Sequence, residues 1–399
     1  MFCALYFGVR RAFKKRRSRI AQYRPRLSER SERIVIFSGG RVKTYTHLFD
    51  QVCAFDSLWN AFHQARKGKR GKAAVADFEY HLERNLLTLE RDLRDGSYRP
   101  GGYRHFYIYE PKRRKISAAP FRDRVVHHAL CTVIEPIFER RFSDLSYACR
   151  IGKGTHRALD RAQSNARRYR YVLQGDVVQF FSSIDHQHLR GLLARRIADP
   201  QVLALIDRIL DSGAGVLSSE YTMQWFPGDD LFTPLSRPRG LPIGNLTSQF
   251  WGNVYLNELD TFVAQELRSG AYVRYADDWL LFSNDKAQLH VWRAQIEAFL
   301  ARMRLVLHTR KTQIYPVATG IPFLGFRLYP AYRRLKRPNV MRFKRRMRRL
   351  FASYADGEIP MDRVQSSIDG WVGHACHGST YRLRRQLLGG LVAPRRGEA

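Results

Sequence analysis

The feature that most constrains the fold is YVRYADDWLLFS, Tyr272–Ser283, in which two apolar runs meet at a pair of adjacent acids. Each run is short enough and apolar enough to predict a buried strand. The gap between the runs, at Asp277–Asp278, is too short for a crossover connection, and so it can join only antiparallel strands. The chain is therefore expected to contain an antiparallel sheet with two carboxylates at a hairpin tip.

Strand patterns alternate with helical patterns along the rest of the chain, which indicates an α+β fold. Helices are expected over Tyr45–Asp95 (with an amphipathic one at Phe78–Leu93), Asp123–Phe142, His186–Leu210, Asn245–Leu267, His290–Met303 and the basic tail Asn339–Gly389. Strands are expected over Tyr103–Glu110, Ile116–Pro120, Tyr171–Asp176 and parts of Val306–Leu328, and Ser212–Pro238 reads as an insertion. In the tail, helical spacing would direct Met341, Phe343 and Met347 toward the core.

The acids at the hairpin tip suggest metal chemistry. Burial of unpaired carboxylates is costly, and a divalent cation such as Mg²⁺ compensates it with oxygen ligands. A further acid, Asp176, ends the apolar strand YVLQGD. Asp176 and Asp277 could converge on a metal pair that drives in-line phosphoryl transfer. Taken alone, adjacent acids are equally typical of an ordinary polar turn.

The charge balance points to a polyanionic partner. The chain of 399 residues has 69 Lys and Arg against 36 Asp and Glu, a formal net charge of +33. Nucleic acid is the first candidate and an anionic membrane surface the second. No window approaches the roughly 18 consecutive apolar residues of a membrane span. The five cysteines are odd in number and widely spaced, which favours a reducing, intracellular setting, and HACH, His374–His377, is read as ordinary helix rather than a metal site.

Residues 1–41 differ from the remainder because Lys and Arg residues are concentrated between Arg10 and Arg19, and no acidic residue precedes Glu29. The segment is interpreted as a disordered or non-native extension, with Val42 as an alternative start. A basic arm for nucleic acid is the other interpretation. Residues 42–170 are expected to form N-terminal helices and a strand pair, 171–330 the sheet with the 212–238 insertion, and 331–399 a basic helical tail.

Three segments together resemble the reverse transcriptases: KRRKISAAPFRDRVVHHAL (Lys112–Leu130), LQGDVVQFFSSIDH and YADD. They are similar to the bacterial branch that includes group II intron proteins. The resemblance implies a right-hand polymerase, with fingers in 42–170, an antiparallel palm in 171–330 and a short helical thumb in 331–399. It also implies RNA-templated DNA synthesis from dNTPs with two Mg²⁺ ions, Mn²⁺ being possible. Asp176, Asp277 and Asp278 would hold the metals, and the Val177 carbonyl would add a ligand.

A further segment, LPIGNLTSQFWGNVYLNELD (Leu241–Asp260), resembles the reverse transcriptases of diversity-generating retroelements. Ile243 stands where most reverse transcriptases have Gln, and Gln249 where they have Pro. The resemblance implies a cytoplasmic enzyme of a bacterial or phage-infected cell. It would copy a template-repeat RNA into cDNA with errors at adenines, for retrohoming, together with a small basic oligomeric accessory protein. The alternatives are a group II intron-like, retron or antiphage reverse transcriptase without diversification, and a noncatalytic RNA-binding derivative.

The same resemblance assigns roles around the acids. Lys112 and Arg114 would contact the triphosphate, and Lys311 would protonate the pyrophosphate leaving group. Phe181 would be the steric gate against a 2′-hydroxyl. Because Phe180 and Phe181 are expected on a strand, only one of them could face the site. The nucleotide would also meet Ile243, Gly244 and Gln249, although Ile243 could instead be a core residue. The primer-grip turn would be Phe323, Leu324, Gly325 and Phe326.

Overall fold

The structure is a computed structural model that describes residues 32–37, 40–109 and 113–391. Its first elements are β1 (Glu32–Phe37) and β2 (Gly40–Tyr45), an antiparallel hairpin in which Glu32 pairs with Tyr45. The hairpin crosses the boundary expected at residue 41, and the basic run from Arg10 to Arg19 lies outside the described residues. Tyr45 joins the hairpin to the body, because its N–H donates to Arg196 and its carbonyl accepts from Ala198.

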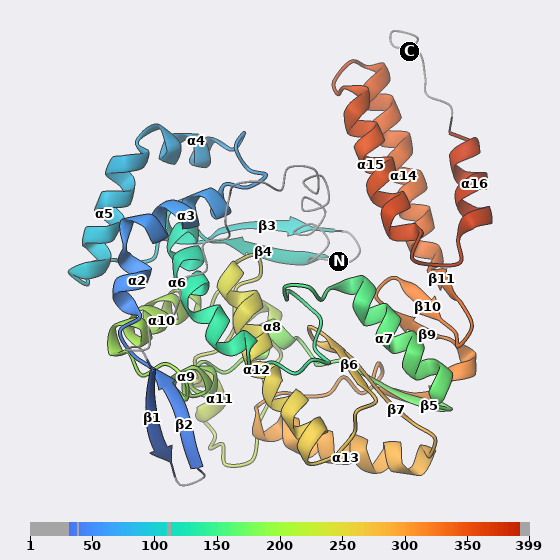
Figure 1. Ribbon diagram of the computed structural model, residues 1–399, viewed down its shortest axis with the longest axis horizontal. Coiled ribbons are helices and arrows are strands. Elements are labelled where there is room, and N and C mark those ends of the chain that lie inside the picture. The colour runs from blue at the N-terminus through green and yellow to red at the C-terminus, as the bar shows by residue number, and fades with distance from the viewer. Residues whose placement is uncertain (1–31, 38–39, 110–112, 392–399) are drawn as a thin grey trace.

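A helical block follows and confirms the helical pattern of this region (Figure 1). It consists of α2 (Phe49–Cys53), α3 (Phe55–Ala65), α4 (Ala73–Tyr80), α5 (Leu82–Arg94) and, packed against α3, α6 (Phe121–Glu139). The single helix expected over Phe78–Leu93 is wrong, because His81 leaves helical geometry at φ −114° and ψ 39°. The Asn85 side chain donates to the Phe78 carbonyl and so replaces a helical N–H at the break.

The strand pair upstream of α6 is β3 (Arg104–Ile108) and β4 (Arg114–Ala118), antiparallel from Arg104 opposite Ala118 to Ile108 opposite Arg114. This confirms the expected strand and returning strand, although the second strand begins at Arg114, inside the segment expected as the basic turn. Residues 110–112 of the turn, Lys112 among them, lie outside the described residues.

The central sheet has the strand order β6 (Tyr272–Tyr275), β7 (Asp278–Ser283), β5 (Tyr171–Gly175) and β8 (Gln313–Pro316), and all neighbours are antiparallel. Successive side chains on each strand point to opposite faces of the sheet and pack into two separate hydrophobic cores. Leu173 and Leu281 join one with α12 (Leu246–Gln265) and α13 (Lys286–Arg302), while Val172 and Leu280 join the other with α7 (Thr155–Arg168). The sheet is thus covered on both faces, and the expected antiparallel α+β arrangement is confirmed.

Two expectations between β5 and α12 are wrong. Phe180 and Phe181 lie in α8 (Phe180–Ser183), not on a strand, because Gln179 turns the chain with a φ of 46°. The helix expected over His186–Leu210 is two helices, α9 (His186–Ala194) and α10 (Pro200–Gly213), since Pro200 begins a new helix that Asp199 caps. The insertion carries a 3₁₀ turn, η3 (Ser218–Glu220), and α11 (Thr233–Ser236).

The C-terminal part begins with η4 (Val317–Thr319) and a small sheet of β9 (Ile321–Phe323), β10 (Phe326–Leu328) and β11 (Arg333–Leu335). It continues as α14 (Arg337–Ala355), α15 (Met361–Ala375) and α16 (Tyr381–Gly389), which project from the body on the opposite side from β3–β4 (Figure 1). Phe343 and Met347 are buried as expected. Met341 is exposed, because it lies two residues, about 200° of helical turn, from Phe343.

Among the helices that the structure describes, none is long and apolar enough to cross a membrane.

Candidate active site

The two adjacent acids lie at the β6–β7 hairpin. Tyr275 pairs with Asp278, so Ala276 and Asp277 form a two-residue turn and Asp278 opens β7. Ala276 has a φ of 56°, a left-handed conformation that costs an Ala more than a Gly. The turn thus stores backbone strain beside the two carboxylates.

Asp176 reaches the same place from the neighbouring strand. Gly175, the last residue of β5, pairs with Trp279, and continuing this antiparallel register by one residue sets Asp176 opposite Asp278. The Asp176 carbonyl also accepts from the His308 N–H, which ties the segment after β5 to the chain before β8. The backbone register therefore brings Asp176 alongside the hairpin acids, and the convergence of Asp176 and Asp277 on a metal pair stays a prediction.

Burial and mutual repulsion raise the pKa values of the two hairpin acids. Burial raises the pKa of Asp278 to about 7, with Asp277 and Asp176 adding to the rise. Burial also raises the pKa of Asp277, and the charge on Asp176 contributes. Arg114, Lys311 and Lys336 oppose these shifts, Arg114 on Asp277, Lys336 on Asp278 and Lys311 on both. The site is therefore a concentration of negative charge that its cations offset only in part.

Lys311 forms an ion pair with Asp176, with side chains 48% and 13% exposed. Across residues 32–37, 40–109 and 113–391, no three His, Cys, Asp or Glu side chains converge closely enough to form a ready-made metal cluster.

Val177 lies in an isolated antiparallel bridge with Leu307, flanked by backbone hydrogen bonds from the His308 N–H to the Asp176 carbonyl and from the Val178 N–H to the Val306 carbonyl. In such a pair the Val177 carbonyl points away from Leu307 and stays available to another partner.

The raised pKa of Asp278 predicts that the metal-free protein loses stability as pH rises. The pKa is near 3.8 for an ordinary Asp and about 7 in the folded chain. The folded state therefore binds the proton more tightly, and this stabilisation, complete below about pH 4, is lost between about pH 4 and pH 7. Urea unfolding in EDTA from pH 5 to pH 8 should show a decline that is smaller in Asp278→Asn, in which only the raised pKa of Asp277 remains. The same pH dependence in both proteins would contradict the assigned shift.

The residues predicted to meet the nucleotide lie around β4 and α12. Gly244 has a φ of 119°, and a Cβ there would lie 2.8 Å from Cγ2 of Ile116, so both backbone and space require Gly. The Ile243 carbonyl accepts from the Ser117 N–H at 2.9 Å, and the Ile243 side chain is only partly buried and belongs to neither hydrophobic core. The core interpretation of Ile243 is therefore wrong.

Phe181 is half-buried and packs beside α12. It lies edge-to-face with Phe180, which is fully in the core, at a centroid distance of 5.2 Å. Both rings line Gly252, where a Cβ would lie 3.3 Å from Phe180 and 3.5 Å from Phe181. Gln249, one turn earlier on α12, accepts a hydrogen bond from the Cys149 thiol at 3.5 Å.

The turn predicted as the primer grip connects β9 and β10. Phe323 pairs with Phe326, and both are buried, while Leu324 and Gly325 between them have φ values of 43° and 89°. Two positive φ angles in a two-residue loop match a type I′ hairpin. The Gly325 carbonyl accepts from the Lys336 N–H and the Asn339 side chain, both at 3.0 Å, which joins the turn to the start of α14.

Two contributions were missed by sequence reasoning. Lys336, just before α14, opposes the rise in the pKa of Asp278, although the two residues are distant in sequence. Arg274 is buried behind the acids and bonds to Asp260 of α12. A charged residue inside the apolar run YVRY was the available signal for Arg274, since such a residue needs a buried partner.

The sequence of the chain is similar to those of known proteins. The model for "Reverse transcriptase (RNA-dependent DNA polymerase)" matches residues 110–328, more than half of the chain. Protein YkfC of Escherichia coli K12 is 29% identical over an alignment of 283 residues, and the match covers 61% of this chain and 71% of YkfC. Group II intron-encoded protein LtrA of Lactococcus lactis is 28% identical over 229 residues, 56% of this chain. That match covers 36% of LtrA, so the chain spans about a third of that relative's length.

Proposed function

Because the chain belongs to the reverse transcriptase family, we propose that it copies a template-repeat RNA into adenine-mutated cDNA for protein diversification by retrohoming. The observation that carries the diversifying role is the segment LPIGNLTSQ, with Ile243 in place of Gln and Gln249 in place of Pro. Ile243 is half-buried outside both cores and next to β4, so a side chain without donors or acceptors is available to the site. That placement supports a role in templating geometry.

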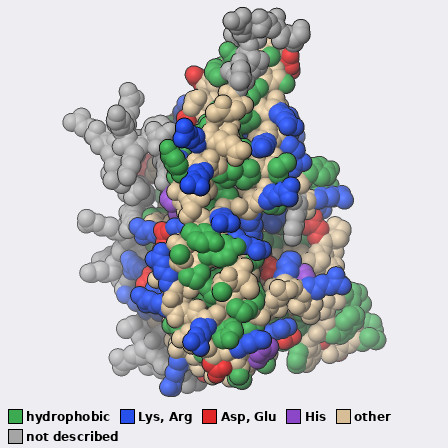
Figure 2. Space-filling model, turned by 90° about the vertical axis from the view of Figure 1, so that its right-hand side faces the viewer, with side chains coloured by type: hydrophobic (Ala, Val, Ile, Leu, Met, Phe, Trp, Pro, Cys, Tyr) green, Lys and Arg blue, Asp and Glu red, His purple; other side chains and the backbone are tan. Residues whose placement is uncertain are grey.

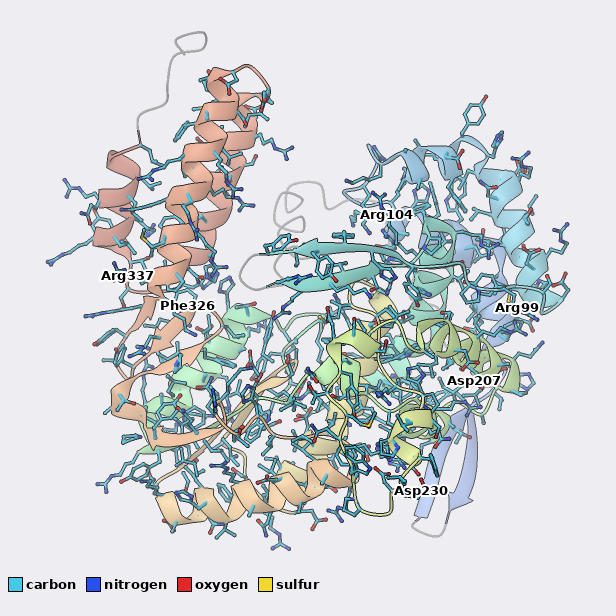
Figure 3. All side chains as sticks on the ribbon, turned by 180° about the vertical axis from the view of Figure 1, so that it is seen from behind. Arg99, Arg104, Asp207, Asp230, Phe326 and Arg337 are labelled. Carbon is cyan, nitrogen blue, oxygen red and sulfur yellow. The ribbon has the colours of Figure 1, made fainter. Side chains whose placement is uncertain are left out.

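We assign the right-hand layout as follows. The helices α2–α6 with the β3–β4 hairpin form the fingers in 42–170, the central sheet with the 212–238 insertion forms the palm in 171–330, and α14–α16 form the thumb in 331–399. The β3–β4 hairpin and the C-terminal helices stand on opposite sides above the central sheet, as seen from behind in Figure 3, where Arg104 marks β3 and Arg337 the start of α14. A template duplex would lie between them, over the acids.

The acids fit two Mg²⁺ ions, or Mn²⁺, held by Asp176, Asp277, Asp278 and the Val177 carbonyl. The donors are oxygens, as Mg²⁺ prefers, and the raised pKa values of the two hairpin acids mark negative charge that lacks sufficient compensation. Bound cations would supply activation of the 3′-hydroxyl and neutralisation of the pyrophosphate. Lys311 compensates Asp176 without metal. Once released from Asp176, its ammonium would be free to protonate the leaving pyrophosphate.

The incoming dNTP is assigned to the surface beside β4 and the start of α12, next to the acids. Arg114 is exposed and close enough to oppose the pKa shift of Asp277, so its guanidinium suits the triphosphate. Lys112, which lies outside the described residues, keeps its predicted role as the second triphosphate contact. Phe181, fixed against Gly252, would stand as the gate against a 2′-hydroxyl. Gly244 and Gln249 follow Ile243 on the same segment and would shape the base-pair side of the site.

The nucleic acid is assigned to the basic surface. Figure 2 shows Lys and Arg side chains spread over one face of the molecule, including the projecting C-terminal helices. On α14, Phe343 and Met347 pack inward while Lys344, Arg345, Arg346 and Arg348 remain exposed, so the outer face of the helix suits a phosphate backbone. The turn of Phe323, Leu324, Gly325 and Phe326 lies at the base of these helices and would hold the primer end. A small basic oligomeric accessory protein remains part of the proposal.

A second function has specific support. The similarity to the group II intron-encoded protein LtrA supports a group II intron-like reverse transcriptase, and such an enzyme without diversification is the alternative. Both functions share the polymerase chemistry, and they differ in the error spectrum of the cDNA. A noncatalytic RNA-binding derivative would make no cDNA at all.

Ile243→Gln is expected to lower misincorporation opposite template adenine more than opposite the other bases. Gln can hydrogen-bond at the base pair, whereas Ile discriminates by packing alone, which is worth only ~1–3 kcal/mol per group. The measurement is deep sequencing of cDNA made on an RNA template by the wild type, Ile243→Gln and the apolar control Ile243→Val. A wild-type spectrum without adenine bias would favour the group II intron-like function. An unchanged adenine error rate in a well-folded Ile243→Gln variant would contradict the role of Ile243.

A further inference from the structure

Arg274 is a buried charge at the base of the acidic turn. It is 0% exposed and lies on β6 among the apolar side chains Tyr272, Val273 and Tyr275. The carboxylate of Asp260 on α12, which is equally buried, accepts hydrogen bonds from Nε and Nη2 of Arg274, both at 2.6 Å, and so forms a bidentate pair. The charge is therefore fully paired inside the protein.

The third nitrogen of the guanidinium forms a hydrogen bond with the turn itself. Nη1 of Arg274 donates to the Ala276 carbonyl at 3.1 Å and to Oδ1 of Asn253 at 3.2 Å. Asn253, also on α12, is held in turn because its amide donates to the Ala148 carbonyl at 2.9 Å. One side chain thus connects α12 to the peptide that immediately precedes Asp277.

We propose that Arg274 is a positioning residue: anchored by Asp260 and Asn253, it fixes the Ala276–Asp277 peptide and so sets where the Asp277 and Asp278 carboxylates lie. The inference rests on the proposed function, in which those carboxylates hold the metal ions. The Ala276 carbonyl belongs to a residue in left-handed conformation, and a hydrogen bond to it offsets the cost of that conformation. Without this bond the turn could relax and redirect Asp277.

Fold stability alone does not account for this arrangement. A buried ion pair contributes little more than well-packed apolar residues of the same volume, because desolvation cancels much of the attraction. The contact of Arg274 with the Ala276 carbonyl also orients a turn that carries two acids, and no apolar side chain could make that contact. Partners of this kind behind a metal ligand typically change metal affinity about 10- to 100-fold when removed.

The test replaces the pair by apolar residues. Arg274→Met with Asp260→Leu removes both charges and keeps the volume, while Arg274→Lys keeps the charge but cannot reach Asp260 and Ala276 together. The control is Arg237→Met with Asp229→Leu, which removes another buried Arg–Asp pair within the insertion, while Asp185, the second partner of Arg237, keeps its ion pair with Arg304. Each protein is measured for thermal melting, primer–template binding, Mn²⁺ binding by electron paramagnetic resonance, and the Mg²⁺ dependence of primer extension.

The expected result is a folded Arg274→Met/Asp260→Leu protein that binds primer–template normally but needs about tenfold or more Mn²⁺ or Mg²⁺ for half-saturation. Arg274→Lys should move in the same direction, and the control pair should not. Wild-type metal dependence in Arg274→Lys, or in the folded double variant, would overturn the inference. If the wild-type protein extends no primer, the polymerase proposal fails, and the Mn²⁺ titration still decides whether Arg274 positions the acids.

Discussion

Asp277→Asn is expected to reduce RNA-templated DNA synthesis by about a thousandfold or more. The substitution keeps the shape of the side chain and removes one charged metal ligand, and metal ions at such sites contribute several kcal/mol of transition-state stabilisation. It should not weaken the fold. The pKa of Asp277 is raised because its ionised form is buried beside Asp176, so a neutral amide relieves repulsion in the metal-free protein.

Single-nucleotide extension of a DNA primer on an RNA template, at saturating Mg²⁺, measures the effect. Asp211→Asn is the matched control, because Asp211 is an exposed acid on α10 with the same change of charge. RNA binding by anisotropy and thermal melting should be unchanged or slightly improved in Asp277→Asn. Extension near the wild-type rate would remove Asp277 from the metal site and, with it, the assigned chemistry.

The parts of this site that depend on local pattern could be predicted from the sequence. The hairpin around Asp277–Asp278 follows from two apolar runs separated by a gap too short for a crossover, and the structure pairs Tyr275 with Asp278. Asp176 ends its own strand, and the antiparallel register then brings it opposite Asp278. Strand periodicity and gap length carry this information because both are local.

Long-range partners and backbone conformation could not be predicted in the same way. Arg274 and Asp260 are 14 residues apart but belong to a strand and a helix whose packing is tertiary. Phe180 and Phe181 follow an apolar strand, and only the left-handed Gln179 diverts them into a helical turn. Lys336 approaches Asp278 because the β9–β10 turn binds the start of α14. None of these depends on a pattern within one segment.

Gly175→Ala is expected to destabilise the protein by about 3 kcal/mol or more, because β5 and β7 meet there without space for a methyl group. A Cβ on Gly175 would lie 2.0 to 2.6 Å from the ring of Trp279, its partner in the sheet, which is fully buried. Neither strand can move away without breaking the ladder on both sides of β5, and so the clash would displace Asp176, the next residue.

Urea unfolding of Gly175→Ala against Gly191→Ala measures this effect. Gly191 lies within α9, and a Cβ there would contact nothing within 4 Å, so its replacement should be neutral or stabilising by about 0.5–1 kcal/mol. Trp279→Leu should recover part of the stability of Gly175→Ala, since it removes the ring that the methyl group meets, although Trp279→Leu alone leaves a cavity and destabilises. Unfolding of Gly175→Ala at the wild-type urea concentration, or additive losses in the double variant, would show that the two strands can separate. The position of Asp176 would then depend on something other than the close contact of Gly175 with Trp279.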